Sequence, residues 1–368
     1  MNSPFSCNNS RYESLKMINS IRANREDEIR TCFENITSSN SNILIYGERG
    51  IGKTFVIRLL EKKLQERCDN VFSFRVNVME ILSYDRIDPI SAFPASVLIH
   101  LCHSIWKDLF KNSHLDLMDP LFNPKKHIKL KNKDEQLIQD IYYRIRSQQR
   151  KLIYQAQNKA GLTAIAKAEM NETYTEEVNP ISLLPFEFFK FIEVIQDEIL
   201  APRGINKLIV LCDEMNILPI ITQKELIERY IELFSERSLQ FIFVAGSIKG
   251  QRIYGVPDCF DVTIELSEFD NIAHIDELIA KRMSGTNLKI DHGAAEIILK
   301  TSGGNPRTIL WVCETATRKV LNRDEETINI DDIRNAAQEV MRHIKQLMAN
   351  MDGGEKLENG VMCHPEIM

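Results

Sequence analysis

Two short stretches of the sequence carry residue types that could do chemistry. The first runs from Gly47 to Thr54, reads GERGIGKT, and satisfies the pattern G-x-x-x-x-G-K-[ST]. In that pattern the backbone N–H groups of the loop surround phosphate oxygens, the lysine supplies a cation, and the hydroxyl is a ligand for magnesium. The phosphate-binding residues that we predict are Gly47, Glu48, Arg49, Gly50, Ile51, Gly52, Lys53 and Thr54.

The flanks of this stretch agree with that interpretation. Residues 42–46 (NILIY) form a short apolar run typical of a buried strand. Residues 55–64 place apolar side chains at helical spacing. Phosphate binding needs this order, because the phosphates interact with N–H groups at the start of the helix. A glycine-rich surface loop is the competing interpretation, and both flanks disfavour it.

The second stretch, residues 207–214 (KLIVLCDE), is an apolar run that ends in two carboxylates. A continuous run of this kind is typical of a strand buried on both faces of a parallel sheet. Its carboxyl end is where open α/β sheets bind ligands. We predict that Asp213 holds magnesium together with Thr54, and that Glu214 orients or deprotonates the attacking water. A solvated acidic turn after the strand is the alternative.

Three further strands are expected, at residues 71–77, 240–247 and 261–266. Ser247 is the last residue of the strand expected at 240–247 and would contact the γ-phosphate or the attacking water. Strands that alternate with helical stretches predict an α/β fold, with a parallel sheet flanked by helices.

Taken together, these motifs resemble those of the AAA+ ATPases, and within that family the initiator-like and STAND-like branch. Residues 24–29 (NREDEI) resemble the short box that precedes the first strand. The two stretches above are similar to the two Walker motifs, and Ser247 occupies the place of the first sensor. Residues 302–307 (SGGNPR) resemble the start of a lid helix whose arginine, here Arg307, is the second sensor.

The resemblance implies a P-loop AAA+ sheet, binding of ATP and Mg²⁺, and hydrolysis of a phosphoanhydride. Lys53, Glu214, Ser247 and Arg307 are the expected catalytic residues, and Arg307 would also contact the nucleotide. A homo-oligomer is expected, in which a neighbouring subunit supplies a further arginine. Arg237 and Arg252 are candidates for that arginine.

We expect three parts along the chain. Residues 1–267 form the nucleotide-binding α/β domain and include a large, mostly helical insertion at 85–200. Residues 268–346 form a C-terminal helical lid, with amphipathic segments at 272–283, 294–301, 307–321 and 331–348. Residues 347–368 form a flexible tail.

The insertion holds a basic segment at 125–151, with nine Lys or Arg against three acids in a chain whose net charge is −6. A solvated charged face is the usual explanation for such a segment, and contact with DNA or with an acidic partner is the competing hypothesis. His100 and His103 share a helical face, for which core packing is favoured over a metal site because no second ligand pair is evident.

Composition indicates the cellular location and the state of the cysteines. The eight cysteines are scattered without a CxxC pair, which indicates free thiols rather than a disulfide framework or zinc site. With no apolar run long enough to span a bilayer and no signal peptide, a cytoplasmic protein is expected. The sequence thus predicts an ATP-hydrolysing switch that acts with DNA, as a loader or transposition regulator. The alternative is a STAND-like signalling or defence ATPase whose nucleotide state is read by a partner protein.

Overall fold

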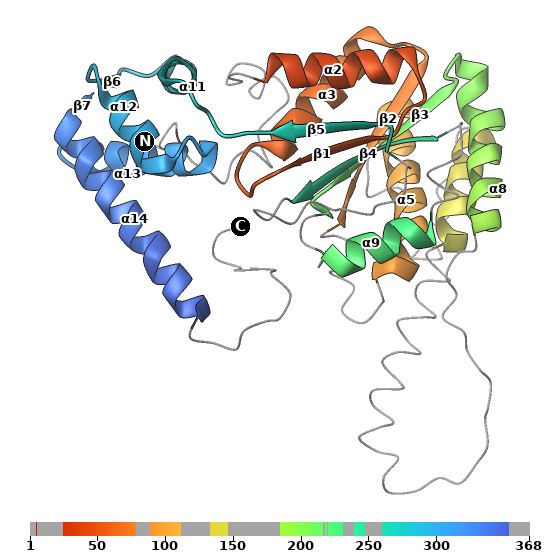
Figure 1. Ribbon diagram of the computed structural model, residues 1–368. Coiled ribbons are helices and arrows are strands. Elements are labelled where there is room, and N and C mark those ends of the chain that lie inside the picture. Colours follow the sequence, from red (N-terminus) through yellow and green to blue (C-terminus); the bar gives the residue numbers. More distant parts are fainter. Residues whose placement is uncertain are drawn as a thin grey trace, which may run out of the picture.

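The computed structural model describes residues 5, 25–78, 89–111, 133–145, 185–215, 218, 220–230, 239–246 and 260–352. Within these residues, five parallel strands form one sheet in the order β2-β3-β4-β1-β5 (Figure 1). The strands are β1 Ile43–Gly47, β2 Val71–Asn77, β3 Lys207–Asp213, β4 Leu239–Gly246 and β5 Val262–Leu266. The predicted α/β parallel sheet is confirmed, and each strand lies within one residue of its expected bounds.

Side chains of successive strand residues enter two separate cores, as the pleat requires. In β3, Ile209 and Leu211 pack with helices α2 (Glu26–Ser38) and α3 (Lys53–Arg67). Leu208 and Val210 point to the opposite face and join a second core there. Because both of its faces are covered, β3 needs apolar residues at consecutive positions, which is the pattern seen at 208–212.

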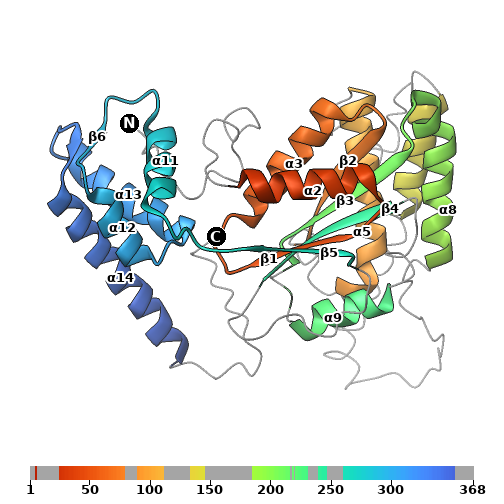
Figure 2. The ribbon, with the colours of Figure 1, turned by 45° about the horizontal axis from the view of Figure 1, so that its top comes forward.

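The second core is covered by α5 (Pro89–Ser104), the helical residues 133–145, α8 (Pro185–Ile195) and α9 (Ile220–Arg229). Figure 2 shows α2 and α3 on one side of the sheet and α5 and α9 on the other. Two of these helices end in π-helical turns, η2 (Ile105–Leu109) after α5 and η3 (Gln196–Leu200) after α8, the latter followed by a short 3₁₀ turn, η4 (Ala201–Arg203).

Helix α5 lies in the segment 85–200 that was expected to be mostly helical, and it begins at Pro89. Its first residues, from Pro89 to Ser96, include two prolines and have low intrinsic helix propensity. Tertiary packing stabilises these residues as a helix, because Phe93 is fully buried and its ring stacks on that of Phe243 from β4, with centroids 6.4 Å apart. Such packing is invisible to a local pattern.

Four helices follow the sheet: α11 (Ile272–Met283), α12 (Ala294–Ser302), α13 (Pro306–Leu321) and α14 (Ile330–Asp352). They surround a core of their own and lie beyond the carboxyl ends of the strands in both ribbon views (Figures 1 and 2). Helix α14 continues to Asp352, past the expected start of the tail at 347.

The sequence did not predict one feature of this part. Two short strands, β6 (Lys289–Ile290) and β7 (Thr327–Ile328), pair in parallel. Two residues are too few to show an alternating pattern, so no periodicity could have indicated them. No described helix is both long enough and apolar enough to cross a bilayer.

Candidate nucleotide-binding site

The predicted phosphate loop connects β1 to α3, at the carboxyl end of the sheet. Gly50 and Gly52 have φ angles of +87° and +99°, in the left-handed region that side chains with a Cβ disfavour. Gly52 immediately precedes the first residue of α3. The pattern of glycines therefore matches a backbone need: the chain turns sharply before the helix starts, which leaves the N-terminal N–H groups of α3 facing this end of the sheet.

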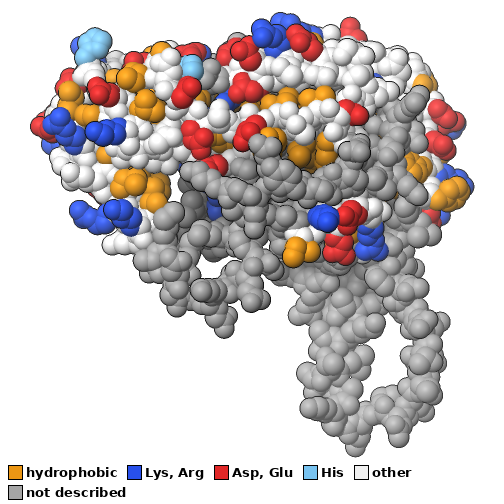
Figure 3. All heavy atoms as spheres, in the orientation of Figure 1, with side chains coloured by type: hydrophobic (Ala, Val, Ile, Leu, Met, Phe, Trp, Pro, Cys, Tyr) orange, Lys and Arg blue, Asp and Glu red, His pale blue; other side chains and the backbone are white. Residues whose placement is uncertain are grey.

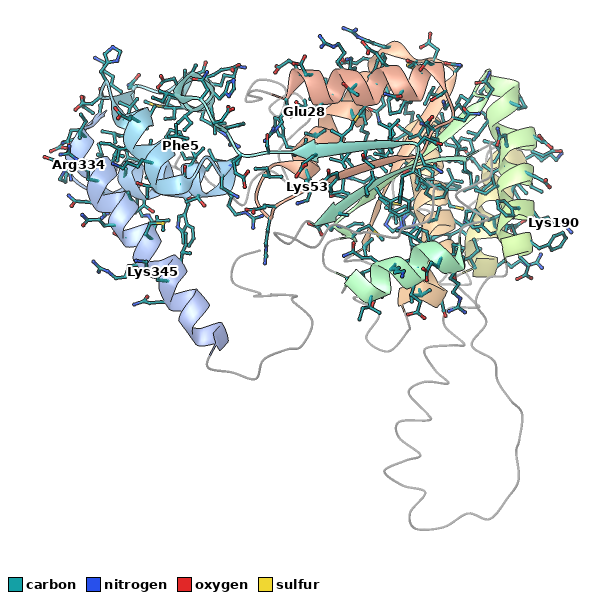
Figure 4. All side chains as sticks on the ribbon, in the orientation of Figure 1. Phe5, Glu28, Lys53, Lys190, Arg334 and Lys345 are labelled. Carbon is teal, nitrogen blue, oxygen red and sulfur yellow. The ribbon has the colours of Figure 1, made fainter. Side chains whose placement is uncertain are left out.

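Lys53 is the first residue of α3 and is buried. Its Nζ donates hydrogen bonds to the carbonyl oxygens of Gly47, at 2.7 Å, and Glu48, at 2.8 Å. Burial lowers the pKa of Lys53 from 10.5 to about 8, and the nearby Asp213 carboxylate partly opposes this shift. Figure 4 shows Lys53 at the end of the sheet that faces the C-terminal helices.

Thr54 and Asp213 meet across the sheet. The Thr54 hydroxyl donates to Asp213 Oδ1 at 3.1 Å, although β4 lies between the strands that lead to these two residues. Asp213 Oδ1 also accepts from the backbone N–H of Glu214, at 2.9 Å. A hydroxyl and a carboxylate side by side are hard oxygen donors of the kind that Mg²⁺ prefers, so the donor set fits this ion.

Glu214 follows β3 directly and is buried, with a φ of +65°. A non-glycine residue in the left-handed region costs roughly 1–3 kcal/mol and persists only where its surroundings hold it. Such outliers are concentrated at functional sites. The strained residue here is the one whose type and position predicted the catalytic base, and that role remains a prediction.

The start of α13 contacts the phosphate loop. Asn305 precedes the helix, and its Oδ1 accepts from the N–H groups of Arg307, at 3.1 Å, and Thr308, at 3.4 Å. Its Nδ2 donates to the Arg49 carbonyl at 3.0 Å. The N–H of Arg307 also approaches the Gly50 carbonyl, at 3.3 Å. Arg307 is thus held beside the loop, where its charge contributes to the lowered pKa of Lys53.

Arg25 was not singled out from the sequence, although it lies in the 24–29 box. Its buried guanidinium donates from Nη2 to the carbonyls of Ile51, at 3.3 Å, and Ser267, at 2.7 Å. Nη1 pairs with Glu28 at 2.9 Å, and the group lies over the Phe269 ring, 5.2 Å from its centroid. Neither Arg25 nor Asn305 carries a local signal for these contacts, except that asparagine is a favoured residue before a helix.

The remaining predicted groups divide in two. Ser247, Arg237 and Arg252 lie outside the described residues, Arg237 before the start of β4 and the other two after its end. His100 and His103 are described: Nδ1 of the first lies 2.8 Å from the Ser96 carbonyl, and the ring of the second contacts that of Tyr142. In the part of the chain that the structure describes, no group of three or more potential metal ligands occurs.

No protein-family model and no curated protein matches this sequence. Among solved structures, the chain is similar to the Aeropyrum pernix ORC1 protein in complex with DNA, with a TM-score of 0.47, 14% identity, and coverage of 92% of this chain and 74% of that one. The Aeropyrum pernix ORC2 protein in its ADPNP-ADP complexes gives a TM-score of 0.46 at 12% identity, covering 94% and 73%.

The Thermotoga maritima RuvB Holliday junction branch migration motor gives a TM-score of 0.39 at 14% identity, covering 85% of this chain and 68% of that chain. Each of these three similarities covers most of this chain, at identities of 12–14%. At these identities the similarity concerns the fold.

Proposed function

We propose that the chain binds ATP with Mg²⁺ at the end of the sheet and hydrolyses it. The observation that carries this proposal is the meeting of two sequence-distant motifs. Thr54, directly after the buried Lys53, donates its hydroxyl hydrogen bond to Asp213 across the sheet. A glycine-rich surface loop without a binding role is not expected to place a lysine and a threonine beside the acidic end of a non-adjacent strand.

Each residue has a distinct task in this proposal. Lys53 exchanges its two carbonyl partners for phosphate oxygens and balances their charge. Thr54 and Asp213 hold the magnesium ion, and Glu214 takes a proton from the attacking water. The bound nucleotide and its metal supply the phosphoanhydride bond and part of the charge neutralisation. Ser247 and Arg307 act at the γ-phosphate, as the resemblance implies.

The C-terminal helices would act as a lid over this site. We infer the boundary at 267/268, because β5 ends at Leu266 and the chain then enters the helices that surround a separate core. The backbone of Arg307 and the side chain of Asn305 contact the phosphate loop, so changes in the loop at hydrolysis reach the helices directly. The protein is then a switch as well as an ATPase.

Action with DNA is our second proposal, and the sequence of the segment 125–151 supports it. The structure describes only residues 133–145 of this segment. There, Lys133 pairs with Glu198 at 3.5 Å, and Arg144 lies over the Phe191 ring at 5.5 Å. On the face drawn in Figure 3, acidic and basic side chains are mixed over the described surface. The other seven cations of the segment lie outside the described residues.

Titration with a fluorescent ATP analogue tests the binding proposal. Lys53→Ala removes charge-assisted hydrogen bonds to the phosphates and should weaken binding roughly 10- to 100-fold. Lys62→Ala is the matched control, since Lys62 lies on the same helix and pairs with Glu66 at 3.5 Å. Equal affinities for the two variants would refute the phosphate-loop assignment.

Hydrolysis measured with and without DNA separates the two biological roles. Stimulation by DNA supports the loader or transposition-regulator role. Indifference to DNA, combined with nucleotide-dependent self-association, supports the STAND-like switch that is read by a partner protein.

A further inference from the structure

All five carbonyl oxygens from residue 47 to residue 51 accept hydrogen bonds. Lys53 takes those of Gly47 and Glu48. The other three are held from outside the loop and its helix. Asn305 Nδ2 donates to the Arg49 carbonyl and the Arg307 N–H to the Gly50 carbonyl. Arg25 Nη2 donates to the Ile51 carbonyl. The phosphate loop therefore has no backbone acceptor left over in this stretch, and its outer rim is fixed to other parts of the chain.

We propose that Asn305 is a positioning residue that links the conformation of the phosphate loop to that of the lid. This inference rests on the proposed ATPase function, because the loop changes its contacts when phosphate binds. It does not require Arg307 to touch a phosphate. The link is the hydrogen bond from Asn305 to the Arg49 carbonyl, combined with the cap that the same side chain makes on α13.

The two ends of the Asn305 amide have different tasks. Oδ1 accepts from two N–H groups at the start of α13, where four backbone donors lack helical partners. A backbone carbonyl can only accept, so the contact with Arg49 needs the NH₂ end. Aspartate would cap a helix equally well but has no donor, and the side chain of serine is one atom shorter. Only asparagine among the favoured capping residues provides both contacts.

The packing around Gly50 makes the link stiff. A Cβ built on Gly50 would lie 2.8 Å from Arg307 Cβ and 2.9 Å from Asn305 Oδ1. On the other side of the segment, a Cβ on Gly304 would lie 1.9 Å from the Phe269 carbonyl oxygen, and the Phe269 N–H donates to the Gly304 carbonyl at 2.9 Å. Residues 304–307 thus lie between the phosphate loop and the chain that leads into the C-terminal helices, in close contact with both.

Phosphate binding has a defined effect on this arrangement. When Lys53 turns to the phosphates, the carbonyls of Gly47 and Glu48 lose the hydrogen bonds from its Nζ, and Glu48 keeps the one from the Ile51 N–H at 3.4 Å. The adjoining peptide groups then readjust, and the next carbonyl along the chain is that of Arg49, which Asn305 holds. A change at the phosphates is therefore passed to the first turn of α13 through main-chain atoms and one side chain.

Hydrogen–deuterium exchange of the full chain tests this link. Asn305→Asp keeps the cap on α13 and removes the donor to Arg49. Asn271→Asp makes the same change at α11, where Asn271 Oδ1 accepts from the Ala273 N–H. In the nucleotide-free protein, Asn305→Asp should speed exchange in peptides covering 47–54 by roughly two- to tenfold, the effect of losing one neutral hydrogen bond. Exchange in peptides covering 306–312 should stay at the parent rate, and Asn271→Asp should leave the loop unchanged.

Addition of Mg-ATP gives the second readout. The parent should gain protection in both the loop and the start of α13, whereas Asn305→Asp should keep the gain in the loop and lose it in α13. Parent-like loop exchange in nucleotide-free Asn305→Asp would overturn the inference, as would a loss of protection confined to the first turn of α13, which would show a cap and nothing more. If the parent binds no ATP, the proposed function fails, while the nucleotide-free rates still decide whether Asn305 holds the loop.

Discussion

Binding of ATP should be accompanied by proton uptake at Lys53 above neutral pH. Burial places the pKa of this lysine at about 8 in the nucleotide-free protein. The phosphates require the ammonium form, so a neutral lysine must gain a proton when they bind. From a pKa of about 8, the uptake is about 0.1 proton per ATP at pH 7, about 0.5 at pH 8 and about 0.9 at pH 9. The affinity should fall by up to about tenfold for each pH unit above 8.

Isothermal titration calorimetry in buffers of different ionisation enthalpy measures this uptake directly. The slope of the observed enthalpy against the buffer ionisation enthalpy gives the number of protons exchanged. The phosphate groups themselves are fully ionised above pH 8, because their last pKa lies near 6. Lys53→Arg is the control, since a guanidinium keeps its charge throughout this range and should abolish the pH-dependent uptake.

The lowered pKa of Lys53 also makes the free energy of unfolding of the nucleotide-free protein depend on pH. The folded pKa of Lys53, about 8, lies below its unfolded value of 10.5, so between these pH values the unfolded chain binds more protons. The free energy of unfolding should therefore rise with pH across that window, by at most about 1.4 kcal/mol per unit. Zero proton uptake at pH 9, or uptake that persists in Lys53→Arg, would refute the reasoning about burial and charge at this lysine.

Two further predictions concern the chemistry and the lid contact. Glu214→Gln keeps the size and polarity of the side chain and removes the base, so ATP should still bind while turnover falls by roughly two orders of magnitude or more; unchanged turnover in a phosphate-release assay would move the base elsewhere. Gly50→Ala and Gly52→Ala both force a side chain into the left-handed region, at roughly 1–2 kcal/mol each. Of the two, only the Cβ added at Gly50 would meet residues at the start of α13. Chemical denaturation should therefore show a larger decrease in the free energy of unfolding for Gly50→Ala than for Gly52→Ala. Equal decreases would contradict the tight contact with Arg307.

The strands and the glycine-rich turn before α3 could be predicted because their signals are local. The apolar run at 207–212 and the glycine spacing before Lys53 each follow from the backbone of a few consecutive residues. Thr54 and Asp213 could be paired in advance only because two known motifs imply a common edge of the sheet. The contact of Asn305 with Arg49 joins positions 256 apart, and that of Arg25 with Ser267 joins positions 242 apart. A local sequence pattern does not record such contacts, nor the stacking of Phe93 on Phe243 at the start of α5.

The place of β4 between β1 and β3 has a consequence for how the site withstands change. Hydrogen-bonded strands lie about 4.8 Å apart whatever side chains they carry, so two such steps separate the strands that lead to Thr54 and Asp213 by roughly 10 Å. That spacing is set by main-chain atoms alone. Side chains above and below β4, including the aromatic stack of Phe241 and Phe243, govern how firmly the sheet holds together. The distance between β1 and β3 therefore does not depend on which side chains fill the core. Substitutions in the core can change the stability of the protein while Thr54 and Asp213 remain opposite each other.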